Sequence, residues 1–337
     1  MRAMELAGPA PLASALHPVV RPDPEPGRGE VLLEVSACAV CRTDLQIVQG
    51  DLPARHLPIV PGHQVVGRIV GLGPGVDPVA HPVGSRVGVA WIAGACGRCR
   101  FCINGRENLC PELRFTGWDR DGGYADQVTA RADFTYALPD GFDDLGAAPL
   151  LCGGSIGFRS LRIAGVDLAD ARGLRLGLFG FGASATVVIQ LAVHAGCEVF
   201  VVTRSDAERD RARALGAAWA GTYEQTPPVP LDAAITFAPA GEVVVAALSA
   251  VDRGGIVAIN AIHLDGIPAF DYEQLWLERS LRSVANVTRT DVVEFLALAA
   301  AVPVETHIEV FPLDQAGVAL ERLAGGRISG AAVLSTG

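Results

Sequence analysis

Four cysteines in one short segment constrain this chain more than any other feature. Cys96, Cys99, Cys102 and Cys110 lie in GACGRCRFCINGRENLC with the spacing C-x2-C-x2-C-x7-C. Four thiolates from a single loop can close a tetrahedron around one zinc ion and leave no open position. Two disulfides or a redox Cys-x-x-Cys pair are the alternatives, but disulfide frameworks are typical of small secreted scaffolds, whereas this chain has 337 residues and 8 cysteines. We therefore predict a structural zinc site that stabilises one lobe.

Composition limits the class of protein. Half of the residues are hydrophobic, and the length of 337 residues suggests about two globular domains. The net charge of -10 argues against nucleic acid or an anionic membrane surface as a partner. The first 20 residues lack the basic and apolar regions of a secretory signal, and no apolar stretch reaches the roughly 18 residues that span a bilayer. We expect a cytoplasmic protein without a membrane partner.

The first 150 residues have the sequence pattern of a β-rich domain. Their apolar runs are short and are bounded by Gly and Pro, a pattern typical of strands with long loops. These runs are VLLEVSACAV (31–40), PIVPGHQVVGRIVGLG (58–73), GSRVGVAWIAG (84–94) and GYADQVTA (123–130).

Beyond Gly173 the sequence pattern changes and predicts strands that alternate with helices. Strands that are apolar at consecutive positions are buried on both faces, and when they alternate with helices they indicate a doubly wound parallel sheet. We place this sheet in residues 151–288. The predicted strands are 174–180, 198–203, 231–238, 254–260 and 281–286, and the helices are 183–196, 205–217 and 242–251. Residues 289–337 contain a helix at 291–302 and a final apolar AAVL, and we expect this segment to return to the first domain.

A glycine-rich turn follows the strand at 174–180. It reads Gly180-Phe181-Gly182-Ala183-Ser184-Ala185, a G-x-G-x-x-A pattern that leads into a helix. Gly180 and Gly182 allow a tight turn and a close approach of the backbone to a pyrophosphate, which the free N–H groups of the helix then bind. Such turns also occur for packing alone, but strand, turn, helix and second strand follow here in order. The sequence therefore predicts a dinucleotide site.

The end of the second strand indicates which dinucleotide. An acidic residue there would hold the adenosine ribose 2′-hydroxyl, yet the strand ends Val202-Thr203-Arg204-Ser205 and no carboxylate precedes Asp206. Neutral Thr203 and Ser205 beside cationic Arg204 suit a 2′-phosphate, so we predict NADP(H) in preference to NAD(H). The alternative is that Arg204 is only a solvated residue at the start of a helix.

Three further segments hold a second set of soft ligands. Cys41 opens Cys41-Arg42-Thr43-Asp44, His63 lies in Gly62-His63-Gln64, and Cys152 lies in APLLCGG. Two thiolates and an imidazole would leave the fourth position of a zinc ion open for a substrate oxygen. Taken singly, each has a simpler interpretation, because cysteine is commonly a small buried hydrophobe and an isolated His beside Gly is commonly a turn residue.

Together these motifs resemble the zinc-dependent medium-chain alcohol dehydrogenases, in the family's order and over essentially the whole chain. The resemblance implies a GroES-like catalytic domain and a Rossmann domain. It also implies two zinc ions per chain, a structural zinc on the four clustered cysteines and a catalytic zinc on Cys41, His63 and Cys152.

By the same resemblance, other residues acquire expected roles. Asp44 is similar to the carboxylate that orients the zinc-ligating histidine, and Thr43 to the hydroxyl that bonds the metal-held oxygen. Arg42 resembles a cation that contacts the pyrophosphate. Trp91 and Trp118 occupy positions expected to line a pocket for a hydrophobic or aromatic substrate, with ordinary core packing as the alternative. The family usually forms homodimers or homotetramers.

The chain departs from the family pattern at three places. Gln46 stands where many members have the histidine that ends the proton relay, and Gln64 stands where Glu is usual. Near the C-terminus Ala331 replaces a pyrophosphate-contacting arginine, which leaves Arg327 as a displaced substitute. Because neither glutamine can act as a base, we expect the site to work better in reduction than in oxidation of an alcohol.

These observations support one main hypothesis and two alternatives. The main hypothesis is an NADP-dependent zinc oxidoreductase that interconverts an alcohol with its aldehyde or ketone, mainly as a reductase. The second is a biosynthetic reductase of an imine or an activated C=C bond, which needs no complete relay to an alcohol. The third is a non-enzymatic structural protein on the same scaffold, against which the presence of all three candidate catalytic ligands argues.

Overall fold

The structure is a computed structural model that describes residues 1–8 and 10–337. The chain divides into two compact units, each described separately below. Unit 1 comprises Met1–Cys152, Asn286–Ala300 and Glu305–Gly337, and unit 2 comprises Gly153–Ala285 and Ala301–Val304. Within the described ranges, no helix combines the length and the apolar character that crossing a membrane requires.

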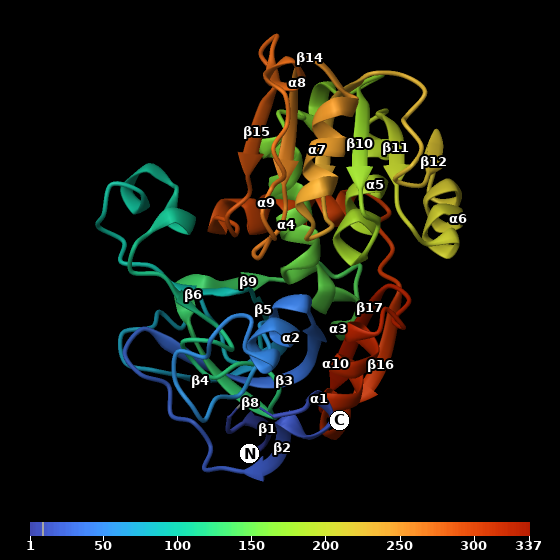
Figure 1. Ribbon diagram of the computed structural model, residues 1–337. Helices are drawn as coiled ribbons and strands as arrows, with labels where there is room; N and C mark the ends of the chain where they lie inside the picture. The colour runs from blue at the N-terminus through green and yellow to red at the C-terminus, as the bar shows by residue number, and fades with distance from the viewer. Residues whose placement is uncertain (9) are drawn as a thin grey trace. The chain divides into compact units, whose positions relative to one another are not determined.

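Unit 1 is built on a seven-stranded, mostly antiparallel sheet (Figure 1). Six strands lie in the order β16 (Ile308–Pro312), β17 (Ala331–Ser335), β3 (Glu30–Val40), β4 (Gln64–Leu72), β5 (Arg86–Val89) and β9 (Thr135–Ala137), and β8 (Gln127–Arg131) also pairs with β3. Because β17 pairs antiparallel with β3, with Leu334 opposite Cys38, the last strand of the chain lies beside one of the first.

The central strand β3 shows why these residues form a sheet. Val31, Leu33 and Val35 are buried at alternate positions while Glu34 between them is exposed, which is the period of a strand with one face on a core. From Ala37 onward every residue of β3 is buried, so the strand is covered on both faces there. The stretch that is buried on both faces leads directly to Cys41.

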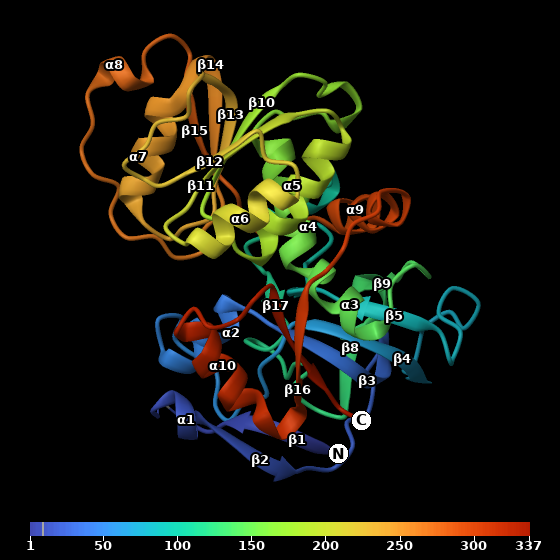
Figure 2. The ribbon, with the colours of Figure 1, turned by 90° about the vertical axis from the view of Figure 1, so that its right-hand side faces the viewer.

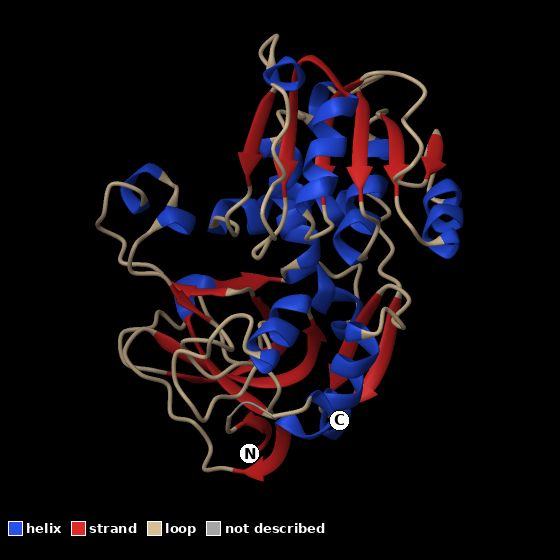
Figure 3. Cartoon of the chain, viewed as in Figure 1, coloured by secondary structure: helices blue, strands red, loops and turns tan. Residues whose placement is uncertain are grey.

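The rest of unit 1 consists of small hairpins, short helices and long loops, the latter drawn tan in Figure 3. The hairpin strands are β1 (Arg2–Leu6) with β2 (Leu16–Val20), and β6 (Ile92–Gly94) with β7 (Arg114–Phe115). The helices are α1 (Leu12–Ala15), α2 (Arg42–Gln49), α3 (Asp144–Ala147), α9 (Arg289–Ala301) and α10 (Ala316–Ala324). The 3-10 turns are η1 (Cys102–Asn104), η2 (Glu107–Leu109), η3 (Ala132–Phe134), η4 (Ala148–Leu151) and η6 (Leu313–Gln315).

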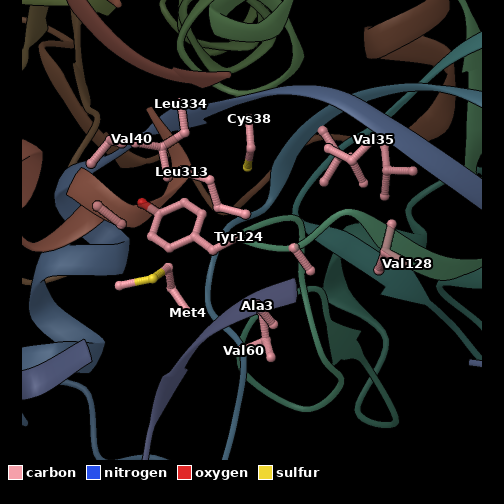
Figure 4. Close-up of a cluster of buried hydrophobic side chains, with 14 of the residues drawn as sticks. Ala3, Met4, Val35, Cys38, Val40, Val60, Tyr124, Val128, Leu313 and Leu334 are labelled. Carbon is pink, nitrogen blue, oxygen red and sulfur yellow. The ribbon is translucent and has the colours of Figure 1, made fainter. Parts of the chain in front are cut away.

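The main core of unit 1 surrounds Tyr124, which is fully buried. Side chains from distant parts of the chain pack around its ring, among them Met4, Cys38 and Leu313 (Figure 4). The core therefore joins the N-terminal hairpin, the main sheet and the C-terminal segment.

Unit 2 is a six-stranded parallel sheet. Its strands lie in the order β12 (Trp219–Gly221), β11 (Glu198–Val202), β10 (Arg175–Phe179), β13 (Leu231–Thr236), β14 (Val251–Ile259) and β15 (Ser280–Ser283). The order reverses between β10 and β13, and ligands of doubly wound sheets bind at such a point, outside the carboxyl ends of the strands. The predicted Rossmann sheet is thus confirmed, although the short strand β12 had no equivalent in the prediction.

Helices cover both faces of this sheet. The helices are α4 (Gly153–Ile163), α5 (Ala183–His194), α6 (Asp206–Ala214), α7 (Gly241–Ala250) and α8 (Tyr272–Leu275), and the 3-10 turn η5 is Leu168–Asp170. Helices α4, α5 and α6 lie on one face of the sheet and α7 on the other (Figure 2). The central strands β10, β11 and β13 are therefore largely buried between layers, in agreement with their continuous apolar runs, whereas the edge strand β15 is partly exposed.

Candidate active site

The four clustered cysteines meet in the loop that contains η1 and η2. Their four sulfur atoms lie within 4.8 Å of one another, and all eight cysteines of the chain are free thiols. Cys99 Sγ lies 3.5 Å from Cys102 Sγ, and the backbone N–H groups of Cys96 and Cys99 donate to Cys110 Sγ and Cys96 Sγ at 3.5 and 3.4 Å. A backbone N–H of Cys102 lowers the pKa of the Cys99 thiol to about 7. This donor set fits a closed zinc site, because backbone N–H groups stabilise thiolates.

A second cluster brings together Cys41, His63 and Cys152, all within unit 1. Their ligand atoms also lie within 4.8 Å of one another. The Nε2 atom of His63 is fully buried and has no hydrogen-bond partner among the described residues. A buried ring nitrogen that faces two sulfur atoms needs a partner, and a metal ion fits that requirement.

Local structure explains how Cys41 and Asp44 come to lie together. Cys41 is the N-cap of α2, and Asp44 occupies the third helical position. The backbone N–H of Cys41 donates to Asp44 Oδ2 at 2.8 Å, which completes a capping box. The start of the helix thus places the thiol and the carboxylate side by side.

Asp44 also holds His63. His63 Nδ1 lies 2.9 Å from Asp44 Oδ1, and both side chains are 0% exposed. Burial lowers the pKa of His63, but the charge and hydrogen bond of Asp44 and the neighbouring Cys41 outweigh it and raise that pKa to about 10. A hydrogen bond with Cys152 and the neighbouring His63 lower the pKa of the Cys41 thiol despite its burial. The cluster is therefore electron-rich and favours a cation at its centre.

The remaining residues predicted from the same segments lie around this cluster. Thr43 is buried, with its Oγ1 3.8 Å from Cys41 Sγ. Arg42 is exposed and makes no ion pair with any residue that the structure describes. Gln46 and Gln64 are buried, and Gln64 Nε2 donates to the carbonyl of Ala39 at 3.3 Å.

Aromatic rings form a wall next to His63. The ring centroid of Trp91 lies 5.9 Å from that of His63, and Trp91 stacks on Trp118 at 6.1 Å. Arg55 Cζ lies 3.9 Å above the Trp118 ring, and its guanidinium also pairs with Asp119 at 2.8 Å. Trp118 Nε1 donates to the carbonyl of Pro53 at 2.9 Å, which holds the loop after α2 against the wall.

In unit 2 the glycine-rich turn follows β10 at the reversal of strand order. Gly180 has φ +91°, and a Cβ there would meet the backbone nitrogen of Ala238 at 2.9 Å, so only glycine fits. At Gly182 a Cβ would meet nothing within 4 Å, which leaves open space over the start of α5. Gly182 is the N-cap and makes no side-chain cap bond, and the first turn contains no acidic residue. Ala185 is buried. Free N–H groups beside open space fit a phosphate.

The residues at the end of β11 are only partly available to a ligand. Ser205 caps α6 by accepting a hydrogen bond from the backbone N–H of Glu208, and the Thr203 hydroxyl donates to the Glu208 carboxylate. Arg204 is exposed and forms no ion pair within the described ranges. Sequence reasoning missed Glu208, because it lies inside the helix rather than at the end of the strand.

Comparisons with known proteins agree with this arrangement. Residues 27–140 match the alcohol dehydrogenase GroES-like domain. The chain is 47% identical over 339 residues to a protein of Mycobacterium tuberculosis described as "probable alcohol dehydrogenase AdhA", covering 99% of this chain and 97% of that protein. The chain belongs to the medium-chain alcohol dehydrogenase family. This medium-chain dehydrogenase is therefore an oxidoreductase.

Solved structures place the family's fold over the whole chain. A cinnamyl alcohol dehydrogenase from Sorghum bicolor matches with a TM-score of 0.89 at 25% identity, over 99% of this chain and 97% of that one. A cobalt- and zinc-bound thermostable alcohol dehydrogenase from Pyrobaculum aerophilum matches with a TM-score of 0.87 at 25% identity, over 99% of both chains. The predicted GroES-like and Rossmann folds of this dehydrogenase are thus confirmed.

Proposed function

We propose that this medium-chain dehydrogenase is a zinc-dependent, NADP-preferring reductase that converts an aldehyde or ketone to its alcohol. The observation that carries the proposal is the buried Nε2 of His63, which lies beside the sulfurs of Cys41 and Cys152 and has no hydrogen-bond partner in the described part of the chain. Two sulfurs and one nitrogen make a set of three protein ligands, which is typical of a catalytic zinc with one open position.

Each candidate metal site has a distinct proposed task. Cys41, His63 and Cys152 would hold the catalytic zinc, which when bound supplies a Lewis acid that polarises a carbonyl oxygen. Cys96, Cys99, Cys102 and Cys110 would hold a structural zinc. The similarity to the cobalt- and zinc-bound alcohol dehydrogenase of Pyrobaculum aerophilum supports metal binding here.

The chain's own groups around the catalytic cluster would handle orientation and the proton. Asp44 keeps His63 Nδ1 engaged, so that only Nε2 faces the metal position. The Thr43 hydroxyl can hold a proton at Oγ1 close to the same place. Gln46, by contrast, cannot titrate, so the relay that would carry a proton away from an alcohol is incomplete. For the reducing direction we infer that solvent delivers the proton to the new alcohol oxygen by another path, so the incomplete relay is less limiting there.

The dinucleotide would bind to unit 2, where a nicotinamide ring supplies or accepts the hydride. The turn at Gly180 and Gly182 and the free N–H groups of α5 would bind its pyrophosphate. Arg204 is the group that supports a 2′-phosphate, because its guanidinium has no competing partner among the described residues. Thr203 and Ser205 are engaged by Glu208, so we assign the preference for NADP mainly to Arg204.

We propose a hydrophobic or aromatic substrate. The support is the wall of Trp91, Phe115 and Trp118 beside His63, in which the Trp91 and Phe115 centroids lie 4.5 Å apart. Trp91 and Phe115 are buried in a core cluster, so the partly exposed indole of Trp118 is the apolar face that would complement an aromatic ring.

The alternative reaction is the reduction of an imine or an activated C=C bond. The specific observation that favours it is the pair of amides at Gln46 and Gln64, which leaves no titratable group at either position. Such a reaction does not require a proton relay to an alkoxide.

We further propose that the protein is cytoplasmic and self-associates as a homodimer or homotetramer through unit 2. The strand β15 is an edge strand of its sheet, and an unpaired edge can pair with its own copy across a twofold axis. Exposed apolar side chains precede it in the chain, namely Ile262, Ile267, Tyr272, Trp276 and Leu277. Light scattering coupled to gel filtration tests this assembly.

The decisive experiment for the reaction measures absorbance during NADPH oxidation, with NADH in parallel, against aliphatic aldehydes, aromatic aldehydes and a cyclic imine. We expect turnover of aldehydes with NADPH preferred and aromatic aldehydes favoured. Turnover of the imine alone would establish the alternative reaction. If the protein binds both zinc and NADPH but turns over none of the three substrate classes, the proposal is refuted.

A further inference from the structure

Trp118 is the most accessible member of the aromatic wall that it forms with Trp91 and Phe115. Trp91 and Phe115 are buried, whereas Trp118 is partly exposed. The Trp118 ring stacks on Trp91 with 19° between the ring planes, and Trp91 lies beside His63. Of these three rings, the indole of Trp118 is therefore the one that offers accessible surface to a ligand near the metal cluster.

The turn that carries Trp118 packs against the backbone next to His63. The N–H of Trp118 donates to the carbonyl of Phe115 at 3.4 Å, which helps to close the turn. Gly117 in this turn has φ +73°, and a Cβ there would lie 2.8 Å from the backbone nitrogen of Gly62. The backbone beneath the indole is therefore fixed close to the candidate zinc ligand, and the orientation of the side chain is what remains to be set.

The indole is held by the loop between α2 and β4. Trp118 Nε1 donates to the carbonyl of Pro53 at 2.9 Å, and Cζ of Arg55 lies 3.9 Å from the centre of the Trp118 ring. The hydrogen bond fixes one edge of the indole, and the cation attracts one of its faces. The ring cannot rotate about its side-chain torsions without losing both contacts.

A buried carboxylate holds Arg55 in this position. Arg55 Nη1 donates to both oxygens of Asp119, at 2.8 and 2.9 Å, and the Asp119 side chain is only 3% exposed. Asp119 is itself anchored, because its Oδ2 accepts from the backbone N–H of Phe115 at 2.9 Å. Surface ion pairs usually contribute little, but a shielded carboxylate with a second donor fixes its partner more firmly. Arg55 is thus tied to the residue that directly follows Trp118.

We propose that Arg55 is a positioning residue for substrate recognition, which holds the indole of Trp118 in the orientation that stacks on an aromatic ring of the substrate. The inference rests on the proposed reduction of an aldehyde and deepens the proposed preference for aromatic substrates. Its consequence is that a charged residue outside the metal cluster, rather than the indole alone, determines how strongly aromatic substrates are preferred over aliphatic ones.

The test compares two variants of Arg55 with the wild-type protein. Arg55→Met keeps apolar surface near the indole but removes the charge, and Arg55→Lys keeps the charge but lacks the planar guanidinium. Arg322→Met is the matched control, because Cζ of Arg322 lies 5.4 Å over the Phe311 ring and its guanidinium pairs with Glu309, elsewhere in unit 1. Thermal melts report any loss of stability.

Two measurements are made on each zinc-loaded protein. Steady-state assays with NADPH compare benzaldehyde with hexanal and give KM and kcat separately. Calorimetry with NADPH present compares the binding of benzamide and hexanamide, which carry the same two side groups but are not reduced. The amides therefore report on recognition of the ring without any chemical step.

We expect Arg55→Met to raise KM for benzaldehyde roughly 3- to 10-fold with kcat close to wild type, because stacking binds the ground state and the transition state alike. KM for hexanal should change by no more than about twofold, since an alkyl chain makes no ring stack. Benzamide affinity should fall by the same factor as benzaldehyde KM rises, and hexanamide affinity should stay the same. Arg55→Lys should lie between the wild type and Arg55→Met, and Arg322→Met should resemble the wild type.

Three results would overturn the inference. An unchanged preference for benzaldehyde and benzamide in both Arg55 variants would mean that the guanidinium does not position the indole. Equal losses for aromatic and aliphatic ligands, together with a lower Tm, would show that Arg55 only stabilises the fold. Wild-type protein that binds benzamide no more tightly than hexanamide would have no aromatic preference to position.

The amides also separate this inference from the proposed reaction. If the wild-type protein reduced neither aldehyde, the proposed reaction would be wrong. A selective loss of benzamide affinity in Arg55→Met would still support the positioning role of Arg55 in that case.

Discussion

The Nδ1 atom of His63 lies 2.9 Å from Oδ1 of Asp44, and neither side chain is exposed to solvent. This contact leaves Nε2 as the ring atom available to a metal. Because the carboxylate fixes the ring and increases the basicity of Nε2, Asp44→Asn should weaken zinc binding or turnover about 10- to 100-fold. Equilibrium competition with a chelator, followed by steady-state assays, measures both. Wild-type affinity and turnover in this variant would show that the contact does not support the site.

Cys41→Ala and Cys99→Ala should have different effects, because the two thiols belong to separate clusters. We expect Cys41→Ala to lose one zinc per chain and turnover while its circular dichroism and Tm stay close to wild type. Cys99→Ala should lower Tm, since a structural zinc contributes directly to folding. Elemental analysis and thermal melts distinguish the variants. Full activity of Cys41→Ala would contradict the Lewis-acid role.

Cofactor choice should depend on Arg204 and Glu208 in opposite directions. Arg204→Ala removes the exposed cation just after β11, so NADPH affinity should fall about 10-fold, or about 1.4 kcal/mol, with little change for NADH. Glu208→Gln removes a negative charge that bonds Thr203 and should favour NADPH. Fluorescence titration with both cofactors gives the dissociation constants. Equal losses for NADPH and NADH in Arg204→Ala would exclude a 2′-phosphate contact.

Stability at acid pH should depend on Asp232 in unit 2. A bidentate hydrogen bond with Arg175, at 2.6 and 3.1 Å, lowers the pKa of Asp232 below its unfolded value. This stabilisation is present above the unfolded pKa of about 3.9 and is lost as the pH falls through the lower folded value. Because the pair is partly exposed, Asp232→Asn should cost only about 0.5–1 kcal/mol near neutral pH. Urea melts from pH 3 to 7 should show a smaller decline toward acid for the variant. Parallel curves for the two proteins would rule out this contribution.

Much of the fold could be predicted from the sequence because local patterns agree with it. The apolar runs after Gly173 correspond to β10, β11, β13, β14 and β15, and the turn at Gly180 stands where the strand order reverses. The short strand β12 escaped prediction because three residues carry too little periodicity.

The metal clusters and their surroundings differ in how visible they are in the sequence. The four clustered cysteines have a recognisable spacing, whereas the proximity of Cys41, His63 and Cys152 depends on long-range packing and was inferred from the family resemblance. Glu208 gave no signal in the sequence, because its contact with the Thr203 hydroxyl depends on how the start of α6 folds. The roles of all these residues stay predictions that the variants above test.

The most direct test of the proposed reaction follows the hydride itself. NADPH deuterated at C4 of the nicotinamide is incubated with the zinc-loaded enzyme and an aromatic aldehyde, and the product is examined by mass spectrometry. We predict an alcohol with one deuterium at its carbinol carbon from one of the two C4-labelled epimers, and none with Cys41→Ala. An alcohol that carries no deuterium from either epimer, or labelled alcohol formed equally by Cys41→Ala, would contradict the account.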